Sequence, residues 1–234
     1  MMDQFVYNGI SSREFGVIIN EHTGFIAPER DCEVIEVPGM NGDLTLDNGR
    51  YKNVRLTYKC GISHNFAGQI SALKGWLYSI IGYHRLEDTF EPDYFRMARV
   101  ADTMEPTAYA RARAGQFDIQ FDCKPQRFLK SGEEVHTFTA AGKIINPTHY
   151  NALPLLRVYG TGSFGIGSTT ITINTADTYT DIDCDVQDAY KGATNCNGKI
   201  TLNSGNFPVL KPGENGISMT GITKIELTPR WWTI

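Results

Sequence analysis

The residues that come nearest to a metal site lie in the acidic run Asp181-Ile182-Asp183-Cys184-Asp185. Three carboxylates at alternate positions match the start of a calcium-binding loop. That loop also needs a glycine directly after the third acid and a glutamate at its twelfth position, where this chain has Val186 and Gly192. Alternation along a strand explains the run more simply, with Ile182, Cys184 and Val186 facing a core and the three aspartates facing water. We therefore expect a strand and no calcium site.

The histidines and cysteines are spread too widely to suggest a metal centre or a catalytic dyad. No CxxC pair occurs, no two histidines have metal-ligand spacing, and no histidine adjoins a serine or cysteine in a nucleophile motif. An odd number of distant cysteines predicts reduced, buried thiols, as in a protein made in a cytoplasm. The residues concerned are His22, His64, His84, His136, His149, Cys32, Cys60, Cys123, Cys184 and Cys196.

Three further stretches could bind a ligand, and each has a structural explanation. The glycine-rich run 162–167 has neither a lysine nor a following helix to hold a phosphate, so it predicts a turn. The adjacent acids Glu87-Asp88 and Glu133-Glu134 lack the opposed environments of an acid and base pair. Arg230-Trp231-Trp232 could form a sugar-stacking platform, although packing onto a core is the better explanation. The sequence thus predicts no catalytic residue, no metal ligand and no cofactor.

Composition describes an ordinary globular chain. Of 234 residues, 41% are hydrophobic and 21% charged, and neither a signal peptide nor a membrane-spanning run of about 18 apolar residues is visible. A net charge of −4 disfavours a nucleic-acid-binding surface, which needs clustered Lys and Arg.

The stretch that we expect to organise the chain runs from Cys32 to Cys60. Alternating apolar residues predict one strand near Ile35 and Val37 and a second at Val54 to Lys59, with a long polar arm between them. This arm, at about 33–59, is too polar to bury itself, so we expect it to pack against another chain. The candidate assembly residues are its turn and flanking positions, Pro38, Gly39, Asn41, Gly42, Asp43, Asp47, Asn48, Gly49 and Arg50.

The remaining first half alternates between strand patterns and one helix pattern. Phe66, Ile70, Leu73, Leu77 and Ile80 recur at helical spacing and predict a helix over about 63–81, with Ser63 or Asn65 as cap and Gly82 past its end. Strands are expected at 5–9, 15–19, 94–100 and 117–123, the last stopping at Lys124-Pro125.

The second half changes composition toward Thr, Gly, Asn and Asp. Residues 126–134 lose periodicity and are the expected domain junction. Short strands are expected at 155–159, 170–174, 179–186, 199–202, 217–220 and 224–228, separated by glycine-rich turns such as 160–162 and 212–216. This spacing is typical of a jelly-roll β-sandwich.

In their order along the chain, these segments resemble the siphophage distal tail protein family. The motifs that carry the resemblance cover the whole chain: Phe5-x-Tyr7-Asn8-Gly9, Phe15-Gly16-Val17-Ile18, Val37-Pro38-Gly39-Met40-Asn41-Gly42-Asp43-Leu44, Gly49-Arg50-Tyr51-Lys52-Asn53, Leu73-Lys74-Gly75-Trp76-Leu77, Tyr83-His84-Arg85-Leu86-x-Asp88, Pro154 to Gly162, Gly205 to Leu210, and Ile225 to Trp232.

The resemblance implies a mainly β fold with one principal helix. It places an α+β domain resembling tail-tube proteins at 1–130 and a galectin-like jelly-roll β-sandwich at 131–234. It also implies a hexameric ring at the tail tip of a virion, assembled in the host cytoplasm. The implied partners are the tail tube protein, the tape measure protein, the tail-associated lysin and, in many phages, receptor-binding proteins, with DNA passing through the ring and no membrane contact.

Two other function classes stay open at this stage. A carbohydrate-binding lectin could be built on the sandwich, although fold and function separate easily and no residue set matches a galectin sugar site. An enzyme such as a tail-associated hydrolase is disfavoured because no nucleophile or acid pair stands out.

Overall fold

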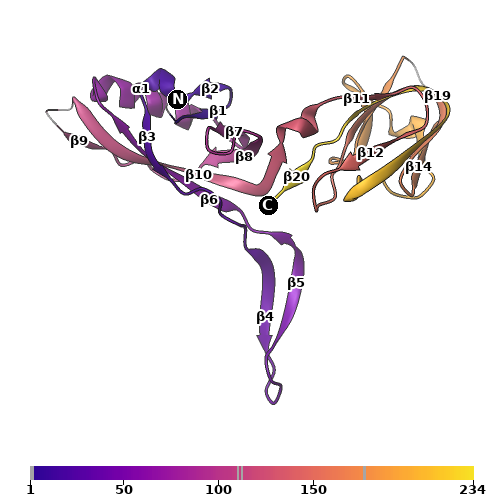
Figure 1. The fold of residues 1–234 in the computed structure, drawn as a ribbon, viewed down its shortest axis with the longest axis horizontal. Coiled ribbons are helices and arrows are strands. Elements are labelled where there is room, and N and C mark those ends of the chain that lie inside the picture. The colour runs from indigo at the N-terminus through magenta and orange to yellow at the C-terminus, as the bar shows by residue number, and fades with distance from the viewer. Residues whose placement is uncertain (1–2, 110, 112, 176–177) are drawn as a thin grey trace. The chain divides into compact units, whose positions relative to one another are not determined.

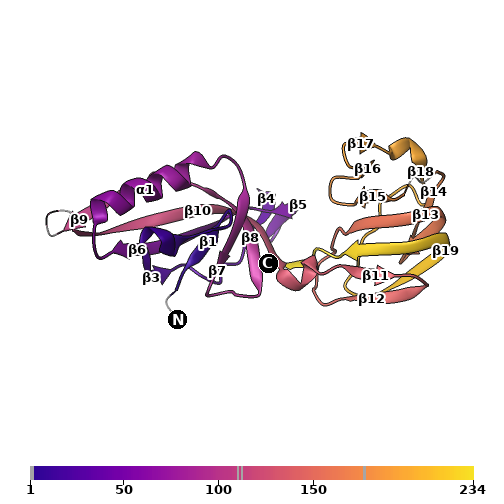
Figure 2. The same ribbon diagram turned by 90° about the horizontal axis from the view of Figure 1, so that it is seen from above.

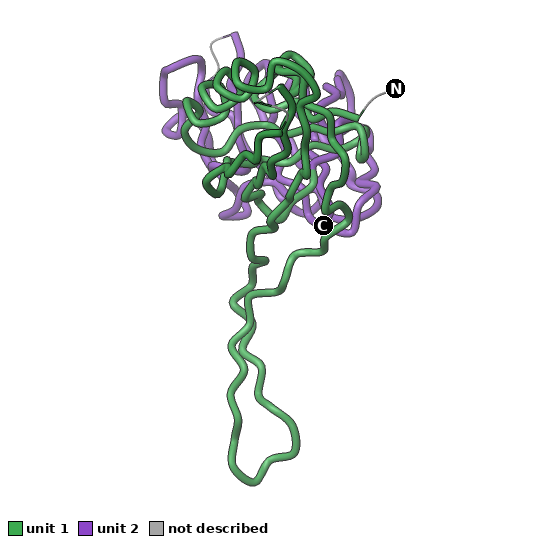
Figure 3. Tube along the Cα trace, turned by 90° about the vertical axis from the view of Figure 1, so that its left-hand side faces the viewer, with its two compact units in different colours: residues 1–127, 234 green, residues 128–233 purple. Residues whose placement is uncertain are grey.

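A computed structural model describes residues 3–109, 111, 113–175 and 178–234. Contacts divide the chain into two compact units, one made of residues 1–127 with 234 and the other of residues 128–233, coloured separately in Figure 3. The predicted class, mainly β with one principal helix, is confirmed.

The first unit is built on an antiparallel sheet whose strands follow the order β2-β1-β7-β8-β10-β6-β3, with β9 also paired to β10. Its elements are β1 (Phe5–Tyr7), β2 (Ile10–Ser11), η1 (Ser12–Phe15), β3 (Ile18–His22), β6 (Val54–Ile62), α1 (Phe66–Ser79), β7 (His84–Asp88), β8 (Tyr94–Val100), β9 (Thr107–Tyr109) and β10 (Ala114–Leu129). A separate ribbon of β4 (Arg30–Glu36) and β5 (Asp43–Tyr51) belongs to the same unit.

Alternation in β6 and β10 creates the apolar face of this sheet. The register pairs Tyr58 with Ile119 and Leu56 with Phe121, and all four side chains are buried. Helix α1 lies along one face of the sheet (Figure 2) and buries Phe66, Ile70, Leu73 and Leu77 of the stripe expected from the helical spacing. Trp76 is buried as well, whereas Ile80 follows the helix and is half-buried.

Two strand predictions for the first unit need correction. The strand expected at 15–19 begins only at Ile18, because residues 12–15 form a 3₁₀ helix closed by Gly16 in the left-handed region. Strand β10 continues through Pro125 to Leu129 instead of stopping there. Proline is tolerated at this position because the ladder with β6 ends at Cys123, so no hydrogen bond to β6 is lost.

The helix is shorter than the predicted 63–81. Asn65 occupies the N-cap position in a left-handed conformation, but its side chain makes no capping hydrogen bond, and Ser63 lies outside the helix. Ile80 ends the helix in an extended conformation, so Gly82 follows the end at a distance instead of closing it.

The second unit is a sheet with the order β11-β19-β13-β15-β16-β17, to which β12 adds on β19, β14 on β13 and β18 on β14. Its elements are η2 (Lys130–Glu133), β11 (His136–Phe138), β12 (Gly142–Asn146), β13 (Leu155–Ile166), β14 (Thr169–Ile173), β15 (Thr180–Asp183), β16 (Asp188–Lys191), β17 (Thr194–Asn195), η3 (Asn197–Lys199), β18 (Ile200–Leu202), β19 (Gly213–Thr228) and β20 (Trp232–Thr233).

Two turns expected in the second unit lie inside long strands. Residues 160–162 form a bulge in β13, and residues 213–216 belong to β19, which joins the two strands expected at 217–220 and 224–228. Gly162 has φ +145, and a Cβ there would lie 2.2 Å from the carbonyl oxygen of Thr220. The glycine therefore permits a close approach of β13 and β19 within a continuous ladder.

Candidate functional site

The region that the sequence assigned to assembly is an isolated two-stranded ribbon. Among the described strands, β4 and β5 pair only with each other, and the ribbon extends away from the sheet of its unit (Figure 1). Val54 to Lys59, which the sequence suggested as the returning strand of the arm, instead forms β6 between β10 and β3 in the main sheet. The arm therefore returns through β5, and the expected span of 33–59 is wrong at its C-terminal end.

The ribbon turns back at residues 37–42. Met40 N–H donates to the Val37 carbonyl at 3.1 Å, and Gly39 and Gly42 have φ of +86 and +83. These glycines supply the left-handed conformations that the turn requires. Pro38, Gly39, Asn41 and Gly42, which the sequence marked as turn residues of the arm, thus form its tip.

The other candidate residues lie in β5. Asp43 pairs with Glu36 at the end of the ladder, while Asp47, Asn48, Gly49 and Arg50 lie near its base. The 47–49 segment is a bulge and no turn: the register shifts opposite Arg30 and Cys32, Gly49 has φ +72, and its N–H donates to Asp47 Oδ1 at 2.8 Å.

Ion pairs fasten the base of the ribbon. Arg30 Nε donates to Asp47 Oδ2 at 2.9 Å, and Arg50 Nε donates to Asp31 Oδ2 at 2.6 Å. The hydrogen bond from Arg30, followed by that from the Gly49 amide, lowers the pKa of Asp47. The Asp31 side chain is mostly covered, but Arg30, Asp47 and Arg50 are exposed to solvent, so the pairs align the strands and add little stability.

The register gives the outer ribbon two different faces. Opposite residues of an antiparallel pair share a face, so Ile35 with Leu44, and Glu33 with Leu46, lie on one side. Ile35, Leu44 and Leu46 are 43%, 53% and 54% exposed, so this side is an uncovered apolar row. An isolated ribbon has marginal stability in water, and such a row is the surface that a partner would bury.

The outer ribbon is also acidic. No lysine or arginine occurs between Asp31 and Gly49. Asp31 and Asp47 are held by the arginines at the base, whereas Glu33, Glu36 and Asp43 are exposed and form no ion pair with the described residues. The apolar row was missed by sequence reasoning because strand pairing decides which side chains share a face.

Two aspartates of the acidic run 181–185 form ion pairs with arginines instead of facing water. Arg157 Nε and Nη2 donate to the two Asp181 oxygens at 2.7 and 3.0 Å, and Arg230 Nη1 and Nη2 donate to those of Asp183 at 2.7 and 2.8 Å. Both aspartates are buried, so the expectation that they face water is wrong. Burial acts to raise the pKa of Asp183, but the hydrogen bonds and charge of Arg230 outweigh it and lower the pKa.

The rest of the run also departs from simple alternation. The strand expected over 179–186 ends at Asp183, where a turn begins, and Val186 is 66% exposed instead of facing the core. Within the described ranges, no group of three or more His, Cys, Asp or Glu side chains could hold a metal ion. In this run, Asp181 and Asp183 act as partners of arginines from β13 and the C-terminal segment.

The cysteines are free thiols, four of them buried and Cys32 half-buried. Burial raises the pKa of Cys60, Cys123 and Cys184 to about 12 in each case. These three are protonated at neutral pH, which makes them poor nucleophiles and metal ligands.

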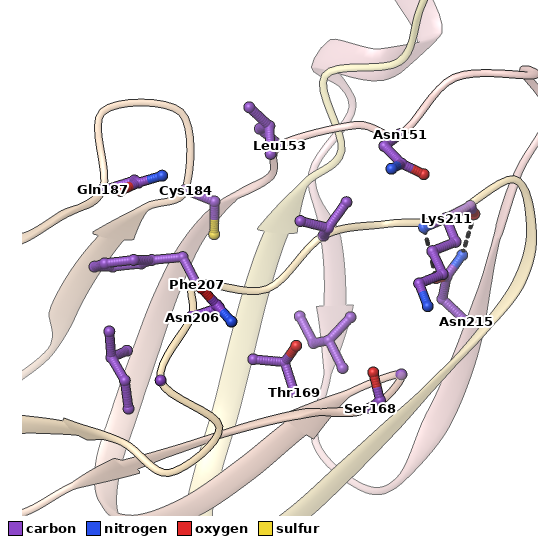
Figure 4. Close-up of a pocket in the computed structure, with 15 residues that line it drawn as sticks. Asn151, Leu153, Ser168, Thr169, Cys184, Gln187, Asn206, Phe207, Lys211 and Asn215 are labelled. Atoms are coloured by element: carbon purple, nitrogen blue, oxygen red, sulfur yellow. Dashed lines mark hydrogen bonds between the residues drawn. The ribbon is translucent and has the colours of Figure 1, made fainter. Parts of the chain in front are cut away.

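The second unit also contains a pocket of about 470 Å³ with an apolar floor and a polar rim (Figure 4). Buried Ile166 and Cys184 line it together with Phe207, while Asn151 and Asn206 supply amides that can both donate and accept hydrogen bonds. Trp232, one residue of the suggested sugar platform, is instead stacked on Tyr150 with ring centroids 4.4 Å apart, and Trp231 is buried in the core.

Among the described residues, no helix combines the length and apolar character needed to cross a membrane. A scan of protein-family models finds no match to the chain, and a search of curated proteins also finds none.

Solved structures do share the fold. The SPP1 Dit protein, described as a paradigm of the hub adsorption apparatus in phages infecting Gram-positive bacteria, matches with a TM-score of 0.79 and 12% identity over 100% of both chains. A chain of the phage P2 baseplate in its activated conformation with Ca matches with a TM-score of 0.56 and 13% identity over 97% of both chains. A chain of the same baseplate with Sr matches with a TM-score of 0.57 and 12% identity over 97% of both chains. The chain therefore has the fold of phage tail hub and baseplate proteins along essentially its whole length, as the resemblance in its sequence implied.

Proposed function

We propose that this chain is a structural virion protein that forms a hub at the distal end of a long non-contractile phage tail. The observation that carries the proposal is the match of the whole fold, including both units, to the SPP1 Dit hub protein. The hub would connect the tail tube to the baseplate or tip complex. Its partners would be the tail tube protein, the tape measure protein, the tail-associated lysin and a receptor-binding protein, and no step of this role needs catalysis.

The hub would be a hexameric ring built by residues 1–130, with residues 131–234 as a galectin-like sandwich. A ring needs a heterologous contact, in which one face of a subunit meets a different face of the next. The exposed β4–β5 ribbon supplies one half of such a contact, because it carries an uncovered apolar row beyond its own sheet. The acidic net charge would limit sticking of DNA that passes through the ring.

Negative-stain microscopy and native mass spectrometry of the purified full chain test the ring. The matched variant replaces residues 35–44 with Asn-Gly, which closes a hairpin between the paired Val34 and Thr45 and keeps the ion-paired base. We expect six-fold rings from the unmodified chain and monomers from the shortened one. A shortened chain that still forms rings would show that the ribbon is not the assembly arm.

A second candidate function is supported by the pocket of the second unit. Its amide rim and the ring of Phe207 suit the hydroxyls and flat apolar faces of a saccharide, so this unit could act in adhesion to a host surface. Glycan-array binding by the full chain, lost in Phe207→Ala, would support this function. Equal glycan-array signals from the unmodified chain and from Phe207→Ala would exclude the pocket as the sugar site.

A further inference from the structure

We propose that the β4–β5 ribbon of one copy binds in the groove between α1 and β9 of the neighbouring copy. This inference rests on the proposed ring function and names the surface that receives the arm. It joins two features that the first unit leaves uncovered and that match each other in polarity and in charge.

The groove is an open, mostly apolar depression on the first unit. Its volume is about 450 Å³, and it is lined by Phe66, Ala67, Ile70, Ser71, Lys74, Pro106 and Ala108. Phe66 and Ile70 form its buried floor, while Ala108 and Lys74 lie at the exposed sides. Small side chains in the walls leave room for another apolar surface to approach.

Cations surround this groove. Lys74 lines it, and α1 contains no other charged residue. Arg113 lies beside the groove, because the Phe66 N–H donates to the Arg113 carbonyl at 3.2 Å, and Arg111 precedes it by two residues in the sequence. All three cations are exposed and form no ion pair with the described part of the chain. Glu105, next to the lining residue Pro106, reduces the local excess to two positive charges.

The outer ribbon has the complementary surface. Its apolar row of Ile35, Leu44 and Leu46 matches the apolar groove, and Glu33 lies on the same face as the row. Glu36 and Asp43 lie on the opposite face at the end of the ladder and add to the net negative charge of the outer ribbon, which is opposite in sign to the charge beside the groove. Opposite charges around an apolar contact favour one partner and one register over others.

The two surfaces cannot meet within one molecule. Within the first unit, α1 lies over one side of the sheet, whereas the ribbon leaves from the other side (Figure 1, Figure 3). The seven residues of β4 extend roughly 23 Å at about 3.3 Å per residue, which carries the apolar row away from its own groove. The contact is therefore between copies and of the head-to-tail kind that closes into a ring.

Charge reversal tests the pairing in the full-length chain. Lys74→Glu with Arg113→Glu reverses the groove, and Glu33→Lys with Glu36→Lys reverses the ribbon. We expect each double variant to need at least about tenfold more protein for half-assembly, because like charges then meet around the contact. The combined fourfold variant is expected to assemble again at close to the original concentration, since the opposite charges are restored with exchanged signs.

Arg13→Glu with Lys143→Glu is the control, since it makes the same change in net charge at exposed positions that do not line the groove and is expected to leave assembly unchanged. Assembly unaffected by the groove reversal, or no rescue in the fourfold variant, would overturn the groove assignment. If rings still disappear when residues 35–44 are shortened, the arm hypothesis survives that result. Absence of rings from the unmodified chain would instead overturn the proposed function.

Discussion

Replacing Leu44 and Leu46 together by serine tests whether the apolar row of the ribbon is the surface buried on assembly. Full burial of a leucine side chain contributes about 1.5–3 kcal/mol. Both side chains are about half exposed, so the part still to be buried is worth roughly 0.8–1.5 kcal/mol each. Their combined loss of about 1.6–3 kcal/mol corresponds to roughly 10- to 150-fold weaker association at each subunit contact.

The assay is the concentration at which half of the protein is assembled, measured by light scattering after size-exclusion chromatography and checked by negative-stain microscopy. Val34→Ser is the matched control, because Val34 is 62% exposed in the same ribbon but lies on the opposite face, paired with Thr45. The thermal midpoint of the monomer should change little in both variants, since the ribbon packs on neither core.

Rings that form at the same concentration in the Leu44→Ser, Leu46→Ser variant as in the unmodified chain would refute the reasoning. An equal loss in Val34→Ser would also refute it, because the effect would then follow from ribbon hydrophobicity in general and not from one face.

Three predictions concern the second unit. Asp183→Asn should lower the free energy of unfolding by about 2–3 kcal/mol in urea titrations at pH 7, because Arg230 loses a charged bidentate partner while remaining mostly buried. Since the folded-state pKa of Asp183 lies below its unfolded value, its contribution is complete above about pH 5 and lost as pH falls through the folded pKa, so the variant and the unmodified chain should converge in acid. Gly162→Ala should lower the free energy of unfolding by more than about 2 kcal/mol, whereas Gly216→Ala, at a position with open space for a Cβ, should lower it by under about 1 kcal/mol. Similar thermal midpoints for the two variants would contradict the close approach at Gly162.

The two buried arginine–aspartate pairs show how a local sequence pattern can mislead. The run 181–185 alternates as a strand does, and β15 does form there. Alternation assigns side chains to two faces, but it does not say what covers the second face. Arg157 and Arg230 lie 24 and 47 residues from their aspartates, so only the folded chain reveals that this face is covered by guanidinium groups.

In the ribbon, turn residues were predictable from the sequence, whereas strand pairing was not. Its tip was predictable, because Gly39 and Gly42 mark turn conformations whatever surrounds them. The strand that pairs with β4 was not predictable, because both β5 and β6 have strand-like sequences. Which of them pairs with β4 depends on which one completes a buried sheet elsewhere. β6 alternates cleanly between buried and exposed residues and is taken into the core between β10 and β3, which leaves β5 to pair with β4.

The sequence alone determined what depends on neighbours along the chain: the helical stripe from Phe66 to Leu77, the mainly β character, the glycine turns of the ribbon tip and the lack of metal-ligand spacing. Tertiary structure alone decided which face of the ribbon is apolar, where the groove beside α1 lies and which arginines meet Asp181 and Asp183. The physical reason is that periodicity and turn chemistry are set by backbone geometry over a few residues, whereas strand pairing and burial are set by contacts between segments far apart in the chain.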